Sequence, residues 1–202
     1  MGVAELLADL RHDARDLRGL DLSGLDLAGT QLLGCAVVDC LLDDTSLLEA
    51  RVVESVLRRV SATTLRTAGS TWRETDVADC RVGALLAAGS VLRRVRVVDA
   101  ALDVVDLRGA ELVDVEFRGC RLGDVDLGGA RLDRVSFVDC RIADLEVRGA
   151  TMHEVDLSRS ELHVVGGVQD LRGSVLSDAQ LLELMPVVAE HLGIRVAEPP
   201  PA

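Results

Sequence analysis

Residues 20–29 read LDLSGLDLAG, which is one five-residue pattern written twice. The pattern continues without an insertion or deletion from Arg15 to Val165. Its central position is every fifth residue from Leu17 to Leu162, and of these thirty residues only Thr67 is polar. Hydrophobic residues make up 49% of the chain, so an unpatterned sequence would place about half as many at these positions. The five-residue register is therefore a real feature of the chain.

A second position of the repeat, two residues before the central one, is also selected. From Leu20 to Val165 it holds only Leu, Val, Ala, Cys, Ser or Thr. A helix does not fit this period, because a five-residue step rotates the side chain by about 140°. A flat strand does not fit either, because its side chains alternate with period two. The pattern predicts a three-residue extended piece with its first and third side chains inward, followed by a two-residue corner.

Glycines mark the second residue of many of these corners, where a sharp turn favours a positive φ. They are Gly19, Gly24, Gly29, Gly34, Gly69, Gly89, Gly109, Gly119, Gly129 and Gly149. A chain that turns after every fifth residue with the same face inward must coil, so the repeat predicts a solenoid.

These residues resemble the pentapeptide-repeat family, whose motif is a small residue, Asp or Asn, Leu or Phe, a polar residue, and Gly or a polar residue. The segments 20–24 (LDLSG), 105–109 (VDLRG), 110–112 (AEL) and 130–132 (ARL) carry the motif. The resemblance implies an all-β fold, a right-handed quadrilateral β-helix with four repeats per coil. Thirty repeats then make seven to eight coils, about 35 Å long at the spacing of neighbouring strands.

A twenty-residue coil predicts which side chains stack inside the solenoid. One inward column contains the only two Phe residues, Phe117 and Phe137, on adjacent coils. Between Ala62 and Ala88 the central position is undersized, at Ala62, Thr67 and Ala87. The core there is expected to be thinner, or filled by Trp72.

Both ends of the chain depart from the repeat. Residues 1–14 have apolar residues at helical spacing and predict an N-terminal capping helix, with partner binding as the alternative. The solenoid is expected over 15–176, with a register break at 164–167 and a last partial coil one residue out of phase. Residues 177–195 predict a helical cap and dimerisation segment, opened by a capping box at Ser177 and Gln180. Pro186 is expected to kink or divide this helix, and 196–202 to form a disordered tail.

The C-terminal helix carries more large apolar residues than one buried stripe needs. Part of this surface can cap the last coil, and we expect the rest to form a homodimer. The candidate dimer-interface residues are Leu181, Leu184, Met185, Val188 and Leu192.

The cysteines and histidines do not indicate a chemical site. All five cysteines are numbered in multiples of five, and each is therefore expected at the small inward position. His153 and His163 are ten residues apart, which places them on opposite sides of the solenoid. No phosphate-binding loop or nucleophile motif is found in the sequence. We therefore expect no catalytic, cofactor-binding or metal-binding residues, and no cofactor.

The net charge of the chain limits the kinds of molecule that it is expected to bind. The formal net charge of −12 argues against direct nucleic-acid or anionic-membrane binding. No run of apolar residues is long enough to span a membrane, and the start lacks a signal peptide, so we expect a cytoplasmic protein. Between Arg51 and Arg96 nine Arg face four acids, a net of +5, whereas between Asp99 and Glu161 fifteen acids face eight Arg, a net of −7. Asp124 and Asp144, one coil apart on one corner, are the candidate acidic partner contacts.

Three classes of function remain. The first hypothesis is a non-enzymatic protein-binding solenoid, a structural or scaffold module whose partner is unknown. The alternative is a DNA mimic that inhibits DNA gyrase and protects it from quinolones, because the chain resembles the Qnr and MfpA groups in length, acidity and C-terminal helical segment. It differs from the Qnr group in having no large projecting loops. An enzyme is a distant third class.

Overall fold

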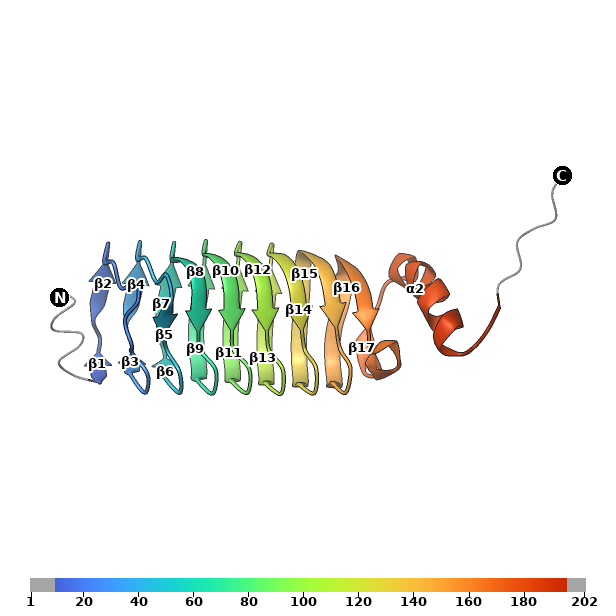
Figure 1. Cartoon of the computed structure of the whole chain (residues 1–202), viewed down its shortest axis with the longest axis horizontal. Coiled ribbons are helices and arrows are strands. Elements are labelled where there is room, and N and C mark those ends of the chain that lie inside the picture. The colour runs from blue at the N-terminus through green and yellow to red at the C-terminus, as the bar shows by residue number, and fades with distance from the viewer. Residues whose placement is uncertain (1–9, 196–202) are drawn as a thin grey trace.

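The protein is a parallel β-solenoid of about 8 turns followed by a helix, and in the computed structural model residues 10–195 are described. Figure 1 shows the coils stacked along the long axis from the N-terminal to the C-terminal end. The strands are β1 (Arg11–Asp13), β2 (Asp16–Arg18), β3 (Gln31–Leu33), β4 (Ala36–Val38), β5 (Thr45–Ser46), β6 (Arg51–Val53), β7 (Val56–Arg58), β8 (Ser61–Arg66), β9 (Thr71–Ala78), β10 (Arg81–Leu86), β11 (Val91–Val98), β12 (Ala101–Asp106), β13 (Glu111–Arg118), β14 (Arg121–Asp126), β15 (Arg131–Glu146), β16 (Thr151–Gly166) and β17 (Ser174–Val175). A 3₁₀ turn, η1 (Val168–Asp170), and a helix, α2 (Asp178–His191), complete the elements.

The coils are twenty residues long through most of the solenoid. Asp16 pairs with Ala36 at one end, and Arg121 pairs with Arg141 near the other. All of these pairings are parallel, because each strand lies on the strand one coil earlier. The predicted fold class is confirmed.

The two selected positions of the repeat form the core. The central residues from Leu17 to Leu157 are buried except Val77 and Leu92, which are half-buried. The predicted stack of the two phenylalanines is confirmed, with ring centroids 4.8 Å apart and an angle of 4° between the planes. Offset or parallel ring contact adds to the free energy gained by burying both rings.

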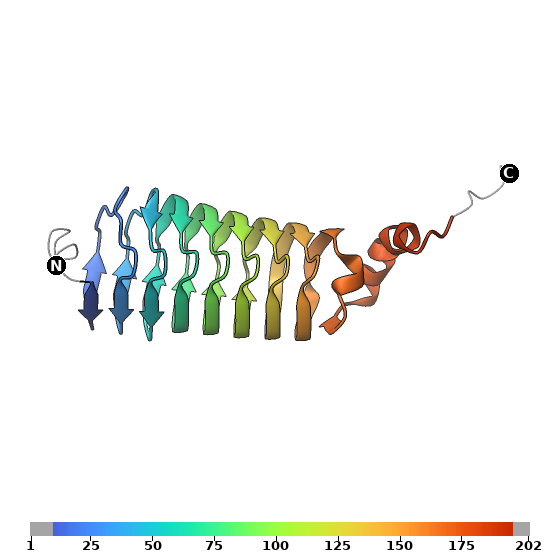
Figure 2. The same cartoon turned by 60° about the horizontal axis from the view of Figure 1, so that its bottom comes forward.

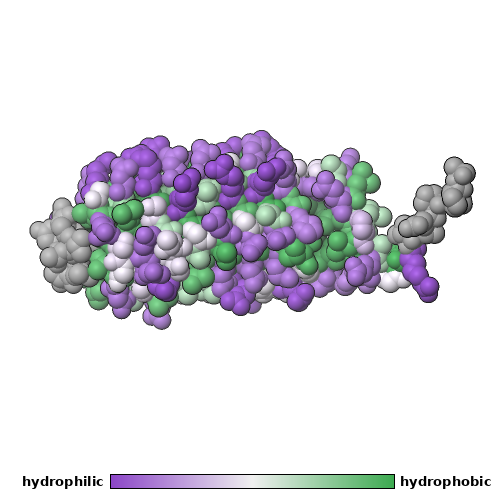
Figure 3. Space-filling model, turned by 45° about the horizontal axis from the view of Figure 1, so that its top comes forward, coloured by the Kyte–Doolittle hydropathy of each residue, from purple (hydrophilic) through white to green (hydrophobic). Residues whose placement is uncertain are grey.

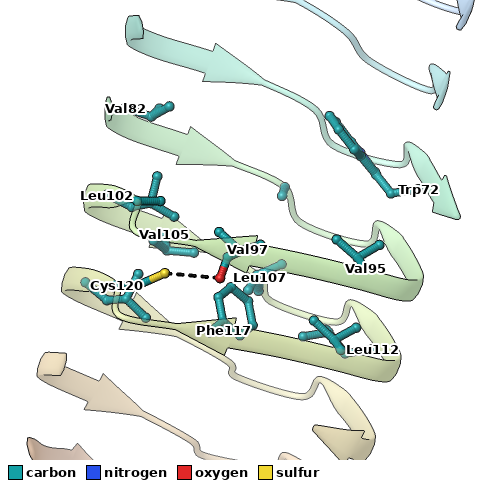
Figure 4. Close-up of a cluster of buried hydrophobic side chains, with 14 of the residues drawn as sticks. Trp72, Val82, Val95, Val97, Leu102, Val105, Leu107, Leu112, Phe117 and Cys120 are labelled. Carbon is teal, nitrogen blue, oxygen red and sulfur yellow. Dashed lines mark hydrogen bonds between the residues drawn. The ribbon is translucent and has the colours of Figure 1, made fainter. Parts of the chain in front are cut away.

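The small inward position also contributes hydrogen bonds. Thr45 donates from Oγ1 to the Leu22 carbonyl at 2.9 Å, and the Cys120 thiol donates to the Val97 carbonyl at 3.4 Å (Figure 4). In both cases the acceptor belongs to the preceding coil and faces the interior. Because a buried carbonyl without a donor costs free energy, hydroxyl and thiol side chains are favoured at this position over other polar groups.

The corners are of two kinds. All ten predicted corner glycines have positive φ, from Gly19 at 61° to Gly149 at 71°. Non-glycine residues also adopt positive φ here, and several carry opposite charges on successive coils, as in the Arg134–Asp114 pair at 2.6 Å. One corner differs, because its second residues have no positive φ on five successive coils and the strand runs through it. These residues are Thr64, Ala84, Val104, Asp124 and Asp144.

The solenoid begins earlier than predicted. Arg11–Asp13 form β1 and pair with Gln31–Leu33, so the expected helix over 1–14 is wrong for these three residues. His12 occupies the central inward position and is buried, which extends the repeat by one unit. The free edge of the next coil offers this segment hydrogen-bond partners that a helix would leave unused, such as the Leu33 carbonyl, which accepts from Ala14 N at 2.8 Å. The remainder of that prediction, like the predicted tail at 196–202, lies outside the described residues.

The register changes near the C-terminal end, as predicted. Leu145 pairs with Val164 and Val155 with Ser174, a step of nineteen residues in each case. Val164 is therefore buried and Val165, expected inward, is 50% exposed. Figure 2 shows the last coil followed by helix α2 at the C-terminal end.

Helix α2 begins at the predicted capping box and closes the last coil. Ser177 Oγ accepts from Gln180 N, and Gln180 Oε1 accepts from Ser177 N at 2.7 Å. The helix is continuous through Pro186, so it is not divided in two. Within residues 10–195, no helix has the length and apolar character that crossing a bilayer requires.

Candidate protein-interaction surfaces

An open acidic groove lies on the face formed by β12, β14 and β15. Asp124 on β14 pairs in register with Asp144 on β15, as the twenty-residue coil predicts. Both line the groove together with Asp106, Asp126 and Glu146. The structure therefore brings the two predicted acidic residues together and adds three more carboxylates to them.

The carboxylates of this groove differ in how far they are neutralised. Arg108 pairs with Asp106 at 2.7 Å, and this hydrogen bond holds the pKa of the Asp106 carboxyl below its usual range. His163 lies 3.0 Å from Asp144. Asp124 has no ion-pair partner among the described residues, so its charge is available to a binding partner.

The groove combines charge with apolar surface. Val104 on its wall is 41% exposed and Val165 at its C-terminal end is 50% exposed. On the face drawn in Figure 3, hydrophilic side chains cover most of the surface and hydrophobic ones gather toward the C-terminal end of the solenoid. An acidic groove with apolar walls suits a partner that brings basic and apolar side chains together.

The corner without positive φ, through which the strands run on from Thr64 to Asp144, explains why this face has room for such a groove. At most corners a residue with positive φ turns the chain sharply. At Val104, Asp124 and Asp144 the strand continues instead, so the side chains of successive coils line up along one ladder. Glycine is absent from the second corner residues of this column from Asp44 to Asp144, but it is also absent from corners with positive φ such as Glu54 and Glu74, so the sequence carried no distinct signal for the continuous strand.

Helix α2 separates the five predicted dimer-interface residues into two groups. Leu184 is buried and Val188 is half-buried, and both pack against the core of the solenoid. These two are therefore corrected from interface candidates to capping contacts. Leu181, Met185 and Leu192 are each more than half exposed, and Leu182 and Ile194, which were not predicted, are exposed as well.

Gln180 has a role that sequence reasoning missed. Its Nε2 donates to the carbonyls of Leu157 and Ser160, at 2.7 and 2.6 Å. The side chain is buried, so one amide both caps α2 and satisfies two carbonyls of the last coil. The signal was a Gln three residues after Ser177, which indicated only the capping box.

The cysteines lie where the repeat predicts. All five are buried and free. Burial raises the pKa of the Cys80 thiol, and the neighbouring Cys140 thiol together with burial raises the pKa of Cys120. Thiols held neutral in this way act as small apolar groups. Among residues 10–195, no three His, Cys, Asp or Glu side chains gather in a way that could hold a metal ion.

Comparison of the sequence and structure with known proteins also detects the five-residue repeat. The family model described as pentapeptide repeats matches residues 120–159 in 8 copies. No curated protein matches the sequence. Among solved structures, the chain is similar to full-length QnrB1, a plasmid-mediated fluoroquinolone resistance protein, with 14% identity over 91% of this chain and 100% of that one and a TM-score of 0.45.

A second solved structure is HetL, a pentapeptide repeat protein involved in heterocyst differentiation regulation from the cyanobacterium Nostoc sp. It shares 19% identity over 88% of this chain and 98% of its own, with a TM-score of 0.34. The family match falls within a register that runs without interruption from the first coil, and the coils have the twenty-residue length that four such repeats make. Residues 120–159 are therefore similar to the pentapeptide repeats, and the coils on either side follow the same five-residue register.

Proposed function

We propose that this chain is a non-enzymatic protein-binding solenoid whose partner docks on the acidic groove of its C-terminal half. The observation that carries the proposal is the registered pair Asp124 and Asp144, set among three further carboxylates. A row of like charges on a rigid sheet attracts a basic partner and fixes its position along the row. The rigid coils spare the protein the entropic cost of ordering this surface on binding.

The uneven distribution of charge supports this location. The coils from Asp99 to Glu161 carry a net charge of −7, whereas those from Arg51 to Arg96 carry +5. A basic partner is attracted to the first region and repelled by the second. The partner's position along the solenoid is thereby restricted to one half.

The experiment compares two charge-reversed variants that alter the net charge equally. Asp124→Arg with Asp144→Arg changes the groove, and Glu49→Arg with Glu54→Arg changes exposed corners of the N-terminal half. A pull-down from the source cell, followed by mass spectrometry, should recover a partner with wild type and with the Glu49/Glu54 variant but lose it with the Asp124/Asp144 variant. Equal recovery with both variants would exclude the groove as the docking site.

We also propose that the exposed face of α2 binds a second copy of the chain. Leu181, Leu182 and Met185 are each at least half exposed on a helix whose opposite face already covers the last coil. A symmetric contact would bury this apolar face on both copies at once.

Sedimentation tests the dimer directly. Leu182→Asp with Met185→Asp should give a folded monomer, because both side chains point away from the solenoid. Leu184→Ala is the matched control, since Leu184 is buried against the core and its loss should lower stability without dissociating the dimer. A wild-type protein that sediments as a monomer at tens of micromolar would refute the proposal.

The second candidate function is a DNA mimic that inhibits DNA gyrase. The observation in its favour is that the groove's carboxylates repeat along the solenoid on successive coils, as in the registered pairs Asp106–Asp126 and Asp124–Asp144. A dimer through α2 would join two acidic halves into one central negative stretch, which could occupy a groove built for phosphates.

A supercoiling assay decides between the two candidates. Under the gyrase hypothesis, wild type inhibits supercoiling at micromolar concentration and Asp124→Arg with Asp144→Arg weakens inhibition about tenfold, the size expected when two charge contacts are reversed. Glu49→Arg with Glu54→Arg should inhibit like wild type. Absence of inhibition by wild type would leave the scaffold function as the better supported one.

A further inference from the structure

The middle of the solenoid is missing side-chain volume on one inward column. Leu47 and Leu107 hold the central position on two coils of this column, and Thr67 and Ala87 replace leucine on the two coils between them. All four residues are buried. Two neighbouring coils therefore lack the branched end of a leucine side chain at the same place.

A cavity of about 90 Å³ occupies this part of the core. Its lining includes Thr67, Ala87, Trp72, Val97, Leu107 and Phe117. Figure 4 shows Trp72, Val97, Leu107 and Phe117 projecting into the interior from successive coils. Trp72 thus fills only part of the space that the small residues leave.

Neighbouring side chains agree with an unfilled space in this part of the core. Val77, Leu85 and Leu92 occupy inward positions, yet they are only half-buried, unlike the equivalent residues of the other middle coils. All three line the cavity. Part of their accessible surface therefore faces the interior void and not the solvent.

The cavity offers water almost no hydrogen bonds. The Trp72 indole donates to Ser70 Oγ at 2.7 Å, and the Thr67 hydroxyl is directed at the Leu86 carbonyl at 3.5 Å. The Cys80 thiol donates to the Ala78 carbonyl at 3.2 Å. A buried water needs about two to four polar partners, so a site whose few polar groups are already engaged stays dry.

We propose that this cavity is a binding site for one small apolar molecule that makes no hydrogen bonds. An engineered cavity of about 150 Å³ with a similar aliphatic and aromatic lining binds benzene or xenon. The smaller volume here favours a ligand of the size of xenon or a diatomic gas over an aromatic ring. This site is independent of the acidic groove, since none of its lining residues reaches that surface except Val105.

The test is xenon binding to the full chain, followed by the chemical shift of hyperpolarised xenon in solution. Wild type should give a saturable shift. Ala87→Leu, which places here the leucine that the next coil has at Leu107, should abolish it, and Ala87→Val should weaken it. Thr67→Val keeps the volume and removes the hydroxyl, so it should retain binding.

Each alternative outcome has a definite meaning. The absence of a saturable shift in wild type would refute the proposal. Retention of binding in Ala87→Leu would place the xenon elsewhere and refute it as well. If Ala87→Leu does not fold, the ordered loss from wild type to Ala87→Val, with Thr67→Val unchanged, still decides the question. Benzene in place of xenon should bind at least tenfold more weakly than xenon if the volume limits the ligand.

Discussion

The middle coils, from Arg51 to Val98, and the later coils, from Ala101 to Glu161, share one backbone pattern but differ both inside and outside. The middle coils carry an excess of Arg and enclose most of the cavity. The later coils are acidic, and Phe117 stacks on Phe137 in their core. The difference shows that the repeat specifies the path of the chain and leaves the core volume and the surface charge free to vary.

The physical reason is that each coil contacts only its neighbours. In such a one-dimensional structure, stability is close to a sum of coil and interface contributions. A poorly filled coil is tolerated when the coils on either side are well filled. The comparison can therefore be tested one coil at a time.

The largest expected effect comes from a charge placed at the central position. Leu112 is fully buried, with an exposed fraction of 0%. Leu112→Arg should lower the free energy of unfolding by about 4 kcal/mol or more, because the guanidinium has no partner in the core. Chemical denaturation measures the loss.

Glu111→Arg is the matched control one residue away. Glu111 lies outside and pairs with Arg93 at 2.5 Å. Its reversal should cost no more than about 1 kcal/mol, the upper range for an exposed ion pair. Equal losses for the two variants would contradict the assignment of inward and outward positions.

A smaller effect should distinguish the two cores. Phe137→Ala removes one ring of the stacked pair in the filled region and should cost about 3–4 kcal/mol. Ala87→Leu adds side-chain volume in the region with the cavity and should raise the free energy of unfolding by about 1 kcal/mol. Thermal melting of both variants tests this, and destabilisation by Ala87→Leu would show that the middle coils have no usable space.

The smallest expected effect is on how the melting temperature depends on pH. The Arg108 hydrogen bond lowers the pKa of Asp106 in the folded state. A lowered folded pKa means that the ion pair stabilises the fold above the unfolded pKa of about 3.9 and that this contribution is lost as pH falls through the folded value. Asp106→Asn should therefore lower the melting temperature at pH 7 and have much less effect near pH 3.

Asp103→Asn on the same strand is the control for this measurement. Asp103 is exposed and forms no ion pair within residues 10–195. Its melting temperature should follow wild type at both pH values. If Asp103→Asn and Asp106→Asn behaved alike, the acid response would come from net charge and not from the Arg108 contact.

Most of the fold could be predicted from the repeat, because each position of the repeat has one physical role. Leu17 and every fifth residue after it predicted the core, and the glycines predicted the positive φ of their corners. The proximity of Asp124 and Asp144 followed from the coil length alone. Local pattern and global fold agree in this part of the chain, so sequence reasoning succeeds.

The ends were less predictable because their structure depends on neighbours distant in sequence. Arg11–Asp13 lie in a segment whose apolar residues are at helical spacing, yet these three residues pair with Gln31–Leu33 as a strand. In α2, apolar residues surround the helix, so the pattern did not reveal that Leu184 faces the solenoid and Leu182 faces away. That choice depends on the angle at which the helix meets the last coil.

The amide of Gln180 protects the C-terminal end of the solenoid from pairing with a further strand. By donating to Leu157 and Ser160, it uses carbonyls that would otherwise template another strand. Two of the acceptors that a second molecule would need to extend the sheet are therefore already used at this end. Gln180→Ala would free these two acceptors and leave α2 and strand β17 to cover the last coil.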